Sequence, residues 1–209
     1  MKKYKLIIFV FLDTLAYCKG LSEHEVRLEQ SLGKEIVSQF IDGGSIDTLK
    51  SVNDAMDTFR LVTPLSPIQE ELVRTWLSWP ESYLFDDSIQ ILKYLKDAGY
   101  RVAIISNSPP TDCDQLVDLG IDKYIDEVIF SFDVGTRKPE KEIFLSLLER
   151  AMVKPSEALM IGDSLKNDIR GASAVGIDSL LLDRNDTSSY KPKITSLLQL
   201  RDFLDQTNF

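Results

Sequence analysis

Histidine and cysteine are nearly absent from this chain of 209 residues, and cationic residues are outnumbered by acidic ones. The single histidine, His24, excludes a multi-histidine metal site and leaves any Ser-His-Asp triad dependent on one residue. Cys18 and Cys113 lack metal-ligand spacing, so we expect reduced thiols in a cytoplasmic protein. A formal net charge of -9 argues against nucleic acid and against anionic membranes as partners.

Long hydrophobic runs are also missing, since no stretch approaches the roughly 20 apolar residues of a membrane helix. The N-terminal run from Leu6 to Leu12 follows basic residues and resembles a secretion signal. However, it is short, Asp13 interrupts it, and bulky Tyr17 stands where signal processing needs a small residue. We therefore interpret it as a strand that is buried on both faces.

What the sequence does contain is an alternation of short apolar runs with helical patterns. Further strands are predicted at 101–107, 127–131, 158–163 and 179–183, and helices at 88–98, 112–119, 140–152 and 168–175. Glycine follows three of these helices, which is the usual helix-stop signal. This alternation predicts an α/β fold with a doubly wound, Rossmann-like parallel sheet, whose ligands bind beyond the carboxyl ends of the strands.

The alternation is interrupted between residues 16 and 85 by a polar stretch rich in helix-forming residues. Helical patterns at 23–40, 46–61 and 67–79 predict a small α-helical bundle inserted after the first strand. The predicted organisation is therefore a core of residues 1–15 and 86–209, with an inserted helical domain at 16–85.

Four short motifs stand at the predicted strand ends or helix starts. They are Val10-Phe-Leu-Asp-Thr-Leu15, Ser106-Asn107, Gly135-Thr-Arg-Lys-Pro139 and Gly162-Asp-Ser-Leu-Lys-Asn-Asp168. In this order they resemble the haloacid dehalogenase-like superfamily, mostly phosphatases that carry a helical cap. The resemblance covers nearly the whole chain, and its last three motifs are specific.

The resemblance implies a role for each of these residues in phosphoryl chemistry. Ser106 and the backbone N–H of Asn107 would donate to phosphate oxygens, and Lys138 would bridge phosphate and carboxylates. Asp163 and Asp168 match the family's magnesium-holding acids. The alternatives are a solvated side chain for Lys138 and helix N-capping for Asp168.

The first motif departs from the family pattern, which is an apolar strand, Asp, any residue, Asp, Gly, Thr and Leu. Alignment on Thr14-Leu15 places Val10 at the nucleophile position, Leu12 at the acid/base position and Asp13 at the glycine. Valine can neither attack phosphorus nor bind metal, and leucine keeps only its backbone carbonyl. Asp13 is an alternative nucleophile, but it would lie too far along the chain, so we expect a turn or capping role for it.

The loss of a carboxylate affects the predicted metal site as well. We expect weak Mg²⁺ binding through Asp163, Asp168 and the Leu12 carbonyl. We also expect Lys138 to be released from its carboxylate partner and to hold an anion, such as inorganic phosphate beside Ser106.

Three hypotheses about function follow from this pattern. The chain is a phosphomonoester hydrolase that uses an unrecognised acid, or a pseudoenzyme that binds a phosphorylated metabolite or a partner. The third is a competent phosphatase that was altered at Val10 and Leu12 by design or by sequence error. We favour a family member of the phosphatase type that is inactive or severely impaired. No peptide groove or exposed apolar stripe in the sequence identifies a protein partner.

Overall fold

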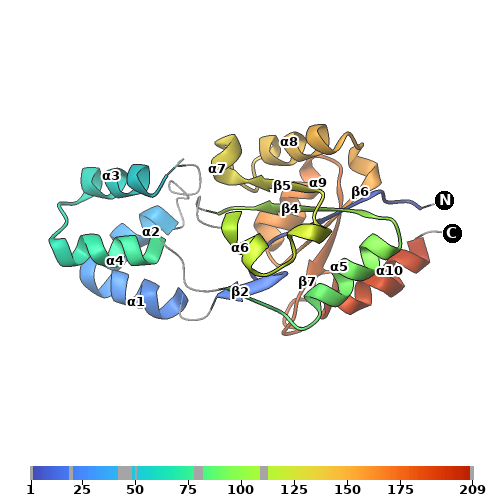
Figure 1. The fold of residues 1–209 in the computed structure, drawn as a ribbon, viewed down its shortest axis with the longest axis horizontal. Coiled ribbons are helices and arrows are strands. Elements are labelled where there is room, and N and C mark those ends of the chain that lie inside the picture. The colour runs from blue at the N-terminus through green and yellow to red at the C-terminus, as the bar shows by residue number, and fades with distance from the viewer. Residues whose placement is uncertain are drawn as a thin grey trace.

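The structure, a computed structural model, describes residues 2–18, 21–41, 49, 51–77, 82–108 and 113–207. Its centre is a six-stranded sheet in the order β5-β4-β1-β6-β7-β8, in which every neighbouring pair is parallel. The predicted α/β fold with a parallel sheet and helices on both faces is confirmed (Figure 1). The strands are β1 (Leu6–Phe9), β4 (Arg101–Ser106), β5 (Glu127–Phe130), β6 (Ala158–Gly162), β7 (Asp178–Leu182) and β8 (Lys193–Ile194).

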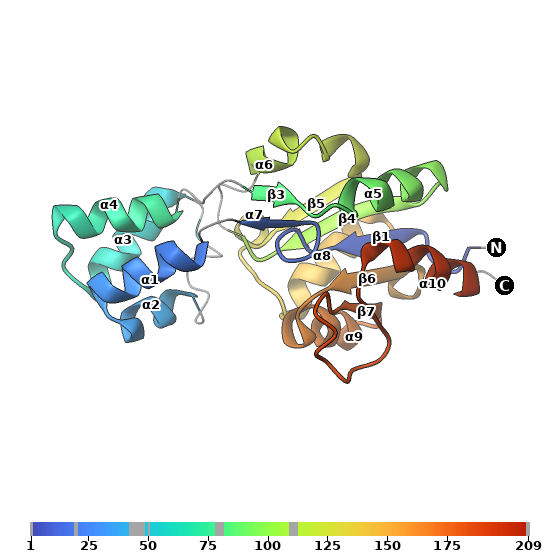
Figure 2. The same cartoon turned by 90° about the horizontal axis from the view of Figure 1, so that it is seen from below.

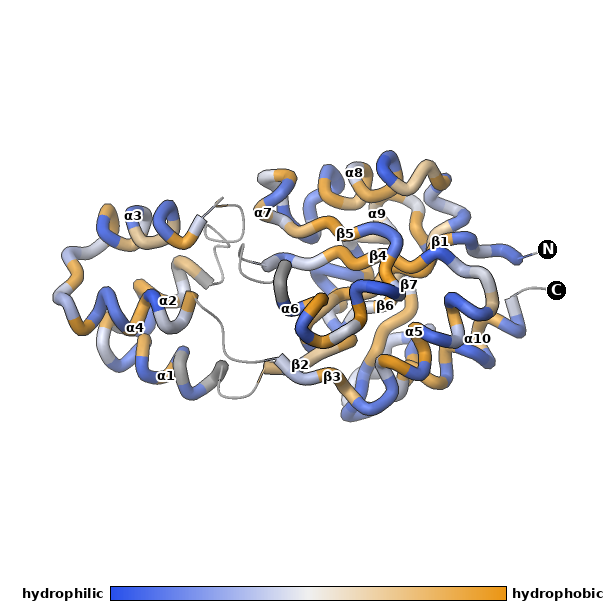
Figure 3. The backbone as a smooth tube through the Cα atoms, in the orientation of Figure 1, coloured by the Kyte–Doolittle hydropathy of each residue, from blue (hydrophilic) through white to orange (hydrophobic). Residues whose placement is uncertain are grey.

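The sheet is buried on both faces because its strands are apolar at successive positions. Side chains alternate across a strand, so β1 sends Leu6 and Ile8 to one hydrophobic cluster and Ile7 and Phe9 to the other. The first cluster is completed by α8 and the second by α5 and α10. Figure 3 shows the hydrophobic colour concentrated along the central strands, while the helices alternate between hydrophobic and hydrophilic.

The helices of the core agree with their predicted positions, with one change. The predicted helix 168–175 begins earlier, as the π-helix η4 (Leu165–Arg170), and continues as α9 (Gly171–Ala174). The remaining helical elements of the core are α5 (Ser88–Asp97), α6 (Cys113–Asp118), η2 (Asp122–Tyr124), α7 (Ser131–Val134), α8 (Lys141–Ala151), η3 (Pro155–Glu157), η5 (Leu197–Gln199) and α10 (Leu200–Thr207).

The inserted helices lie between two short strands that pair antiparallel, β2 (Ala16–Cys18) and β3 (Ser82–Leu84). The helices are α1 (Leu21–Leu32), α2 (Lys34–Ile41), α3 (Val52–Val62) and α4 (Pro67–Leu77). Both views show them gathered together, on the side of the sheet away from the two chain ends (Figures 1 and 2).

These helices have a hydrophobic core of their own, centred on aromatic rings. The rings of Phe40 and Phe59 stack at 3.7 Å between centroids, and Trp76 meets Phe59 edge-on. The prediction of one helix over 23–40 is wrong: Gly33, with φ +91°, divides it because a left-handed residue cannot continue an α-helix. Residues 46–48, 50 and 78–79 of the predicted helices lie outside the described part. The domain boundaries at 16 and 85 stay a prediction.

No helix in the described part of the chain combines the length and the apolar character that crossing a bilayer requires.

Candidate active site

The four motifs meet at the carboxyl edge of the sheet. Ser106 is the last residue of β4, Val10 follows β1, and Asp163 follows β6. Since β4, β1 and β6 are neighbours, these strand ends lie next to one another. Lys138 comes from the loop between α7 and α8. The fold therefore brings residues distant in the sequence to one edge, as parallel sheets do at ligand sites.

Ser106 lies near two other buried serines, Ser108 and Ser131. Its side chain is buried, and its Oγ accepts a hydrogen bond of 2.7 Å from Ser108 Oγ. The Ser108 backbone N–H donates in turn to Ser131 Oγ at 3.1 Å. Because Ser108 donates to it, Ser106 keeps its own hydrogen for another acceptor. Sequence reasoning missed Ser108, although its place just after the motif was a signal.

Asn107 fixes the position of Lys138 through reciprocal hydrogen bonds. The Lys138 N–H donates to Asn107 Oδ1 at 2.7 Å, and Asn107 Nδ2 donates to the Lys138 carbonyl at 3.0 Å. The side chain of Asn107 thus joins the second motif to the third. The sequence had suggested only its backbone N–H as a phosphate donor.

Lys138 and Asp168 form a buried ion pair. Lys138 Nζ donates to Asp168 Oδ1 at 2.6 Å, and the two side chains are only 4% and 1% exposed. The expectation that Lys138 lacks a carboxylate partner is therefore wrong, because Asp168 supplies one regardless of Val10. A lysine ammonium has three donors, so two remain for an anion after this bond.

Asp168 is also held by the backbone. Its second oxygen, Oδ2, accepts the Ser164 N–H at 2.9 Å. A Cβ added at Gly162 would lie only 2.5 Å from that same oxygen, so a glycine is needed there. The N-cap of η4 is Ser164, whose Oγ accepts the Asn167 N–H, and not Asp168. Both oxygens of Asp168 are thus engaged by protein donors.

Val10 continues the apolar alternation of β1. It is 7% exposed and belongs to the same hydrophobic cluster as Ile8, Ile105 and Ile129, while its N–H donates to the Ile161 carbonyl at 3.2 Å. Leu12 is half-buried and packs against the other cluster. Hydrocarbon therefore occupies both positions at which the family pattern has carboxylates.

Asp13 lies in the turn that follows. Its φ is +60°, in the left-handed region that glycine tolerates most easily, as expected for a residue aligned with the family's glycine. Its N–H donates to the Ala16 carbonyl at 2.7 Å and closes the turn. Desolvation by the neighbouring protein atoms raises the pKa of its carboxyl, even though the residue is exposed.

Asp163 receives one hydrogen bond from a side chain, from Thr14 Oγ1 at 3.2 Å. Its pKa is raised to about 6, first by desolvation and then by the negative charges of Asp168 and Asp13. The positive charge of Lys138 offsets this only in part. Asp163 is therefore a carboxylate whose charge is poorly compensated.

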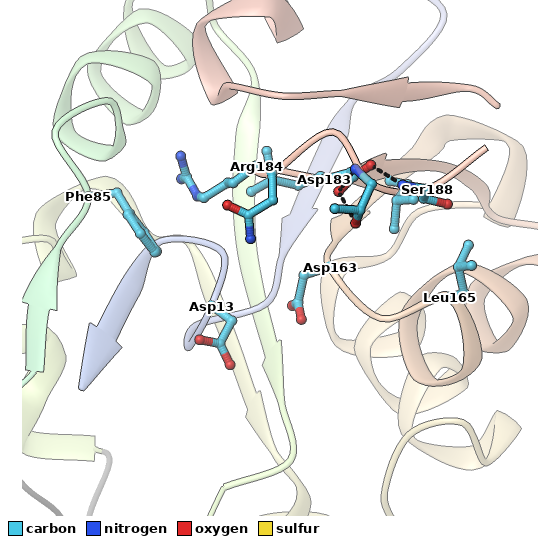
Figure 4. A pocket seen from close by; sticks show the side chains of 11 residues that line it. Asp13, Phe85, Asp163, Leu165, Asp183, Arg184 and Ser188 are labelled. Atoms are coloured by element: carbon cyan, nitrogen blue, oxygen red, sulfur yellow. Dashed lines mark hydrogen bonds between the residues drawn. The ribbon is translucent and has the colours of Figure 1, made fainter. Parts of the chain in front are cut away.

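A cavity of about 560 Å³ opens beside these two carboxylates, at the carboxyl ends of β6 and β7. Figure 4 shows Asp13 and Asp163 at one side of it, with Phe85, Leu165, Arg184 and Ser188 around it. Ser106 and Lys138 do not line it, so the cavity adjoins the motif residues without containing all of them. This wall was not predicted, although Asp183 ends a predicted strand and Arg184 follows it.

Arg184 ties the cavity wall to the first motif. Its guanidinium donates to both oxygens of Asp87, at 2.9 and 3.0 Å, and to the Thr14 carbonyl at 2.9 Å. It also lies over the Phe85 ring, 3.8 Å from the centroid. Because planar bidentate pairing restricts both partners, these contacts hold the turn at Thr14 in place.

The same pairing predicts how stability changes with acid. Burial alone would raise the pKa of Asp87, but hydrogen bonds from Arg184, the Leu197 N–H and Ser196 Oγ outweigh it and hold the pKa below its usual value. Because the pKa of Asp87 is lower in the folded state, its charged form stabilises the fold at any pH above the unfolded-state pKa, which is near 4. This stabilisation is lost as the pH falls through the folded-state pKa. We expect Asp87→Asn to be less stable at neutral pH and to lose less stability on acidification below about pH 4. Urea unfolding across that pH range measures both, and parallel curves for the two proteins would contradict the assignment.

The residues present do not fit a resident Mg²⁺ ion. Within the described ranges, no group of three or more His, Cys, Asp or Glu side chains is placed to hold a metal. Val10 offers no oxygen from its side chain, and both oxygens of Asp168 are engaged. Only Asp163 and the carbonyl of Leu12 remain from the predicted ligand set. Mg²⁺ prefers an octahedral set of oxygen ligands, which two ligands supply poorly.

Comparison with known sequences gives a consistent family. The model of the haloacid dehalogenase-like hydrolase family matches residues 17–176. A glyceraldehyde 3-phosphate phosphatase from Methanopyrus kandleri is 33% identical over 52% of this chain and 47% of its own length. A ribulose-1,5-bisphosphate 5-phosphatase from Halopiger xanaduensis is 37% identical over 52% of this chain and 46% of its own. The chain thus spans about half the length of these curated relatives.

Solved structures share the fold over nearly the whole chain. A HAD phosphatase from Thermococcus onnurineus has a TM-score of 0.71 at 28% identity and covers 98% of this chain and 100% of its own. The HAD-hydrolase YfnB from Bacillus subtilis, solved bound to magnesium, has a TM-score of 0.69 at 20% identity and covers 98% of this chain and 100% of its own. At that lower identity the likeness supports the fold alone.

Proposed function

The chain belongs to the haloacid dehalogenase-like hydrolase family, and from this premise we propose that it binds a small phosphorylated molecule, or inorganic phosphate, which it hydrolyses poorly or not at all. The same proposal places it in the cytoplasm and gives it at most a weak interaction with Mg²⁺. The phosphorylated substrates named for its relatives support the ligand class.

One observation carries the proposal: the side chain at position 10 is a hydrocarbon packed among hydrocarbons. An attacking oxygen must lie in line with the phosphorus, and misplacement on the order of 1 Å already costs about 10²-fold in rate. Val10 has no such oxygen, and Leu12 has no group that can exchange a proton with the leaving group. Hydrolysis of the family type therefore lacks its first step.

The donors for an anion are nevertheless present. The proposed phosphate site combines the free hydrogen of Ser106, the backbone N–H of Asn107 and the remaining donors of Lys138. Groups that are already held by Ser108, Asn107 and Asp168 lose little freedom on binding, which favours affinity. Binding without turnover is what this combination supports best.

A second candidate function follows from the position of Asp13. It lies beside Asp163 on the cavity wall, so it is the carboxylate nearest in sequence to the missing nucleophile that a substrate could meet. In this alternative the chain is a hydrolase that acts through Asp13. Asp13→Asn separates the two candidates, because amide nitrogen and oxygen cannot replace an attacking carboxylate.

The test measures binding and turnover on the same protein. We expect inorganic phosphate to bind in isothermal titration, and we expect p-nitrophenyl phosphate with MgCl₂ to be hydrolysed no faster by the native protein than by Asp13→Asn. Ser106→Ala should weaken phosphate binding by about tenfold or more, since a hydrogen bond to a charged group is lost. Ser146→Ala on α8 is the matched control and should bind as the native protein does. Rapid hydrolysis that Asp13→Asn abolishes would establish the second candidate instead.

A further inference from the structure

Resting on the proposed function, we infer that phosphate binding at this edge of the sheet needs no Mg²⁺, and that Asp163 opposes the anion instead of assisting it. In a site that holds a metal, a carboxylate reaches phosphate through the cation, so removing the carboxylate weakens binding. Without a metal the same carboxylate faces the anion directly. The sign of its effect is then reversed.

The first step of the argument is that Asp168 cannot turn toward a metal. Its carboxylate is 1% exposed, and its oxygens accept from Lys138 Nζ at 2.6 Å and from the Ser164 N–H at 2.9 Å. It is packed so closely against Gly162 that an added Cβ would overlap it. Rotation would leave the buried Lys138 ammonium and a backbone donor without partners, which is costly.

The second step is that the other family ligands cannot replace it. Val10 contributes only hydrocarbon at the place where the family pattern has a carboxylate shared between substrate and metal. Mg²⁺ gives up its water ligands reluctantly, so it requires a strong set of anionic oxygens. Both oxygens of Asp168 accept from protein donors, so Asp163 is the one carboxylate of the expected ligand set that is left for a cation.

The third step concerns the balance of charge around the anion. The positive charge of Lys138 is already neutralised by Asp168. Asp163 lies close enough to interact electrostatically with both residues. The other charged groups on the cavity wall are paired: Arg184 with Asp87, and Asp183 with Lys193. The surplus at this edge is therefore the negative charge of Asp163, with Asp13 beside it, and it repels a phosphate dianion.

The test is a calorimetric titration of inorganic phosphate, once with excess EDTA and once with excess MgCl₂. We expect the two dissociation constants to agree within about twofold, because no cation joins the complex. We expect Asp163→Asn to bind phosphate about three- to tenfold more tightly than the native protein, because one repelling charge is removed. The control is Asp97→Asn, which makes the same change at an exposed position at the end of α5. This residue precedes β4 and so lies at the opposite edge of the sheet from the site. We expect the Asp97→Asn variant to bind phosphate with the same affinity as the native protein.

The outcomes separate this inference from the proposed function. Phosphate binding that tightens by tenfold or more with MgCl₂, or that Asp163→Asn weakens, would overturn the inference and leave the proposed function standing. The absence of phosphate binding in all arms would overturn the proposed function. In that case, titration of the native protein with MgCl₂ alone still tests the inference that the site does not hold Mg²⁺. Val10→Asp/Leu12→Asp is the positive control, and strong Mg²⁺ binding by the native protein would overturn that inference.

Discussion

Val10→Asp/Leu12→Asp is expected to convert this protein into a phosphatase, with kcat on p-nitrophenyl phosphate rising by at least about a thousandfold over the native chain. The scale follows from what enzymes lose when a nucleophile is removed from an otherwise complete site. The donors of the proposed phosphate site are already held: Ser108 donates to Ser106, Asn107 holds Lys138, and Lys138 is paired with Asp168. The two substitutions supply what is missing, which is the attacking carboxylate, the proton-transferring group and a carboxylate ligand for Mg²⁺.

The control for this experiment is Val10→Asn/Leu12→Asn. Asparagine has nearly the volume of aspartate and imposes a similar burden on the apolar cluster around Val10, but it cannot attack phosphorus. We expect it to fold with similar stability and to remain inactive. Both variants should be less stable than the native chain, which urea unfolding measures. Equal activity in the aspartate and asparagine variants would show that the position does not limit turnover.

Removal of Lys138 is expected to give the largest loss of stability. In Lys138→Met, the Asp168 carboxylate loses its cation at a place that is only 1% exposed. Breaking a buried pair by removing one partner costs about 3–5 kcal/mol. Since small domains are stable by about 5–15 kcal/mol, we expect a large shift of the urea midpoint. Lys141→Met, which removes a largely exposed lysine at the start of α8, is the control and should cost little.

A double variant separates the charge from the packing. Lys138→Met/Asp168→Leu removes both partners, so no uncompensated charge is left, and we expect it to recover much of the stability that Lys138→Met loses. If the double variant is instead no more stable than Lys138→Met, the pair does not act as a charge pair. In that case the stabilisation would lie in the shape of the two side chains.

The strands of the core could be predicted because they are continuous apolar runs, and a parallel sheet buries such runs on both faces. The motif residues could be placed because each follows a strand, and the carboxyl ends of neighbouring strands share one edge. The positions of Leu6 and Ser106 in the sheet could therefore be predicted from the sequence. This reasoning depends on local pattern alone.

Two of the features that were missed depend on pairing between distant segments. Arg184 and Asp87 are far apart in the sequence, and their pairing cannot be recognised until the fold brings them together. The ribbon of β2 and β3 is too short for its periodicity to be recognised, and its strands are separated by all four inserted helices. Gly33 was a local signal that was overlooked, because a helical pattern continues on both sides of it.

The pairing of Lys138 with Asn107 and Asp168 affects which residues of such a site can be substituted during evolution. These residues look like the working parts of a phosphatase, yet the fold itself depends on them. A lineage that had stopped turning over substrate would still be penalised for drift at Lys138, because the chain would unfold more readily. Motif residues that also stabilise the fold can thus be retained after the reaction is lost. A position such as Val10, where an apolar residue packs well, is free to change.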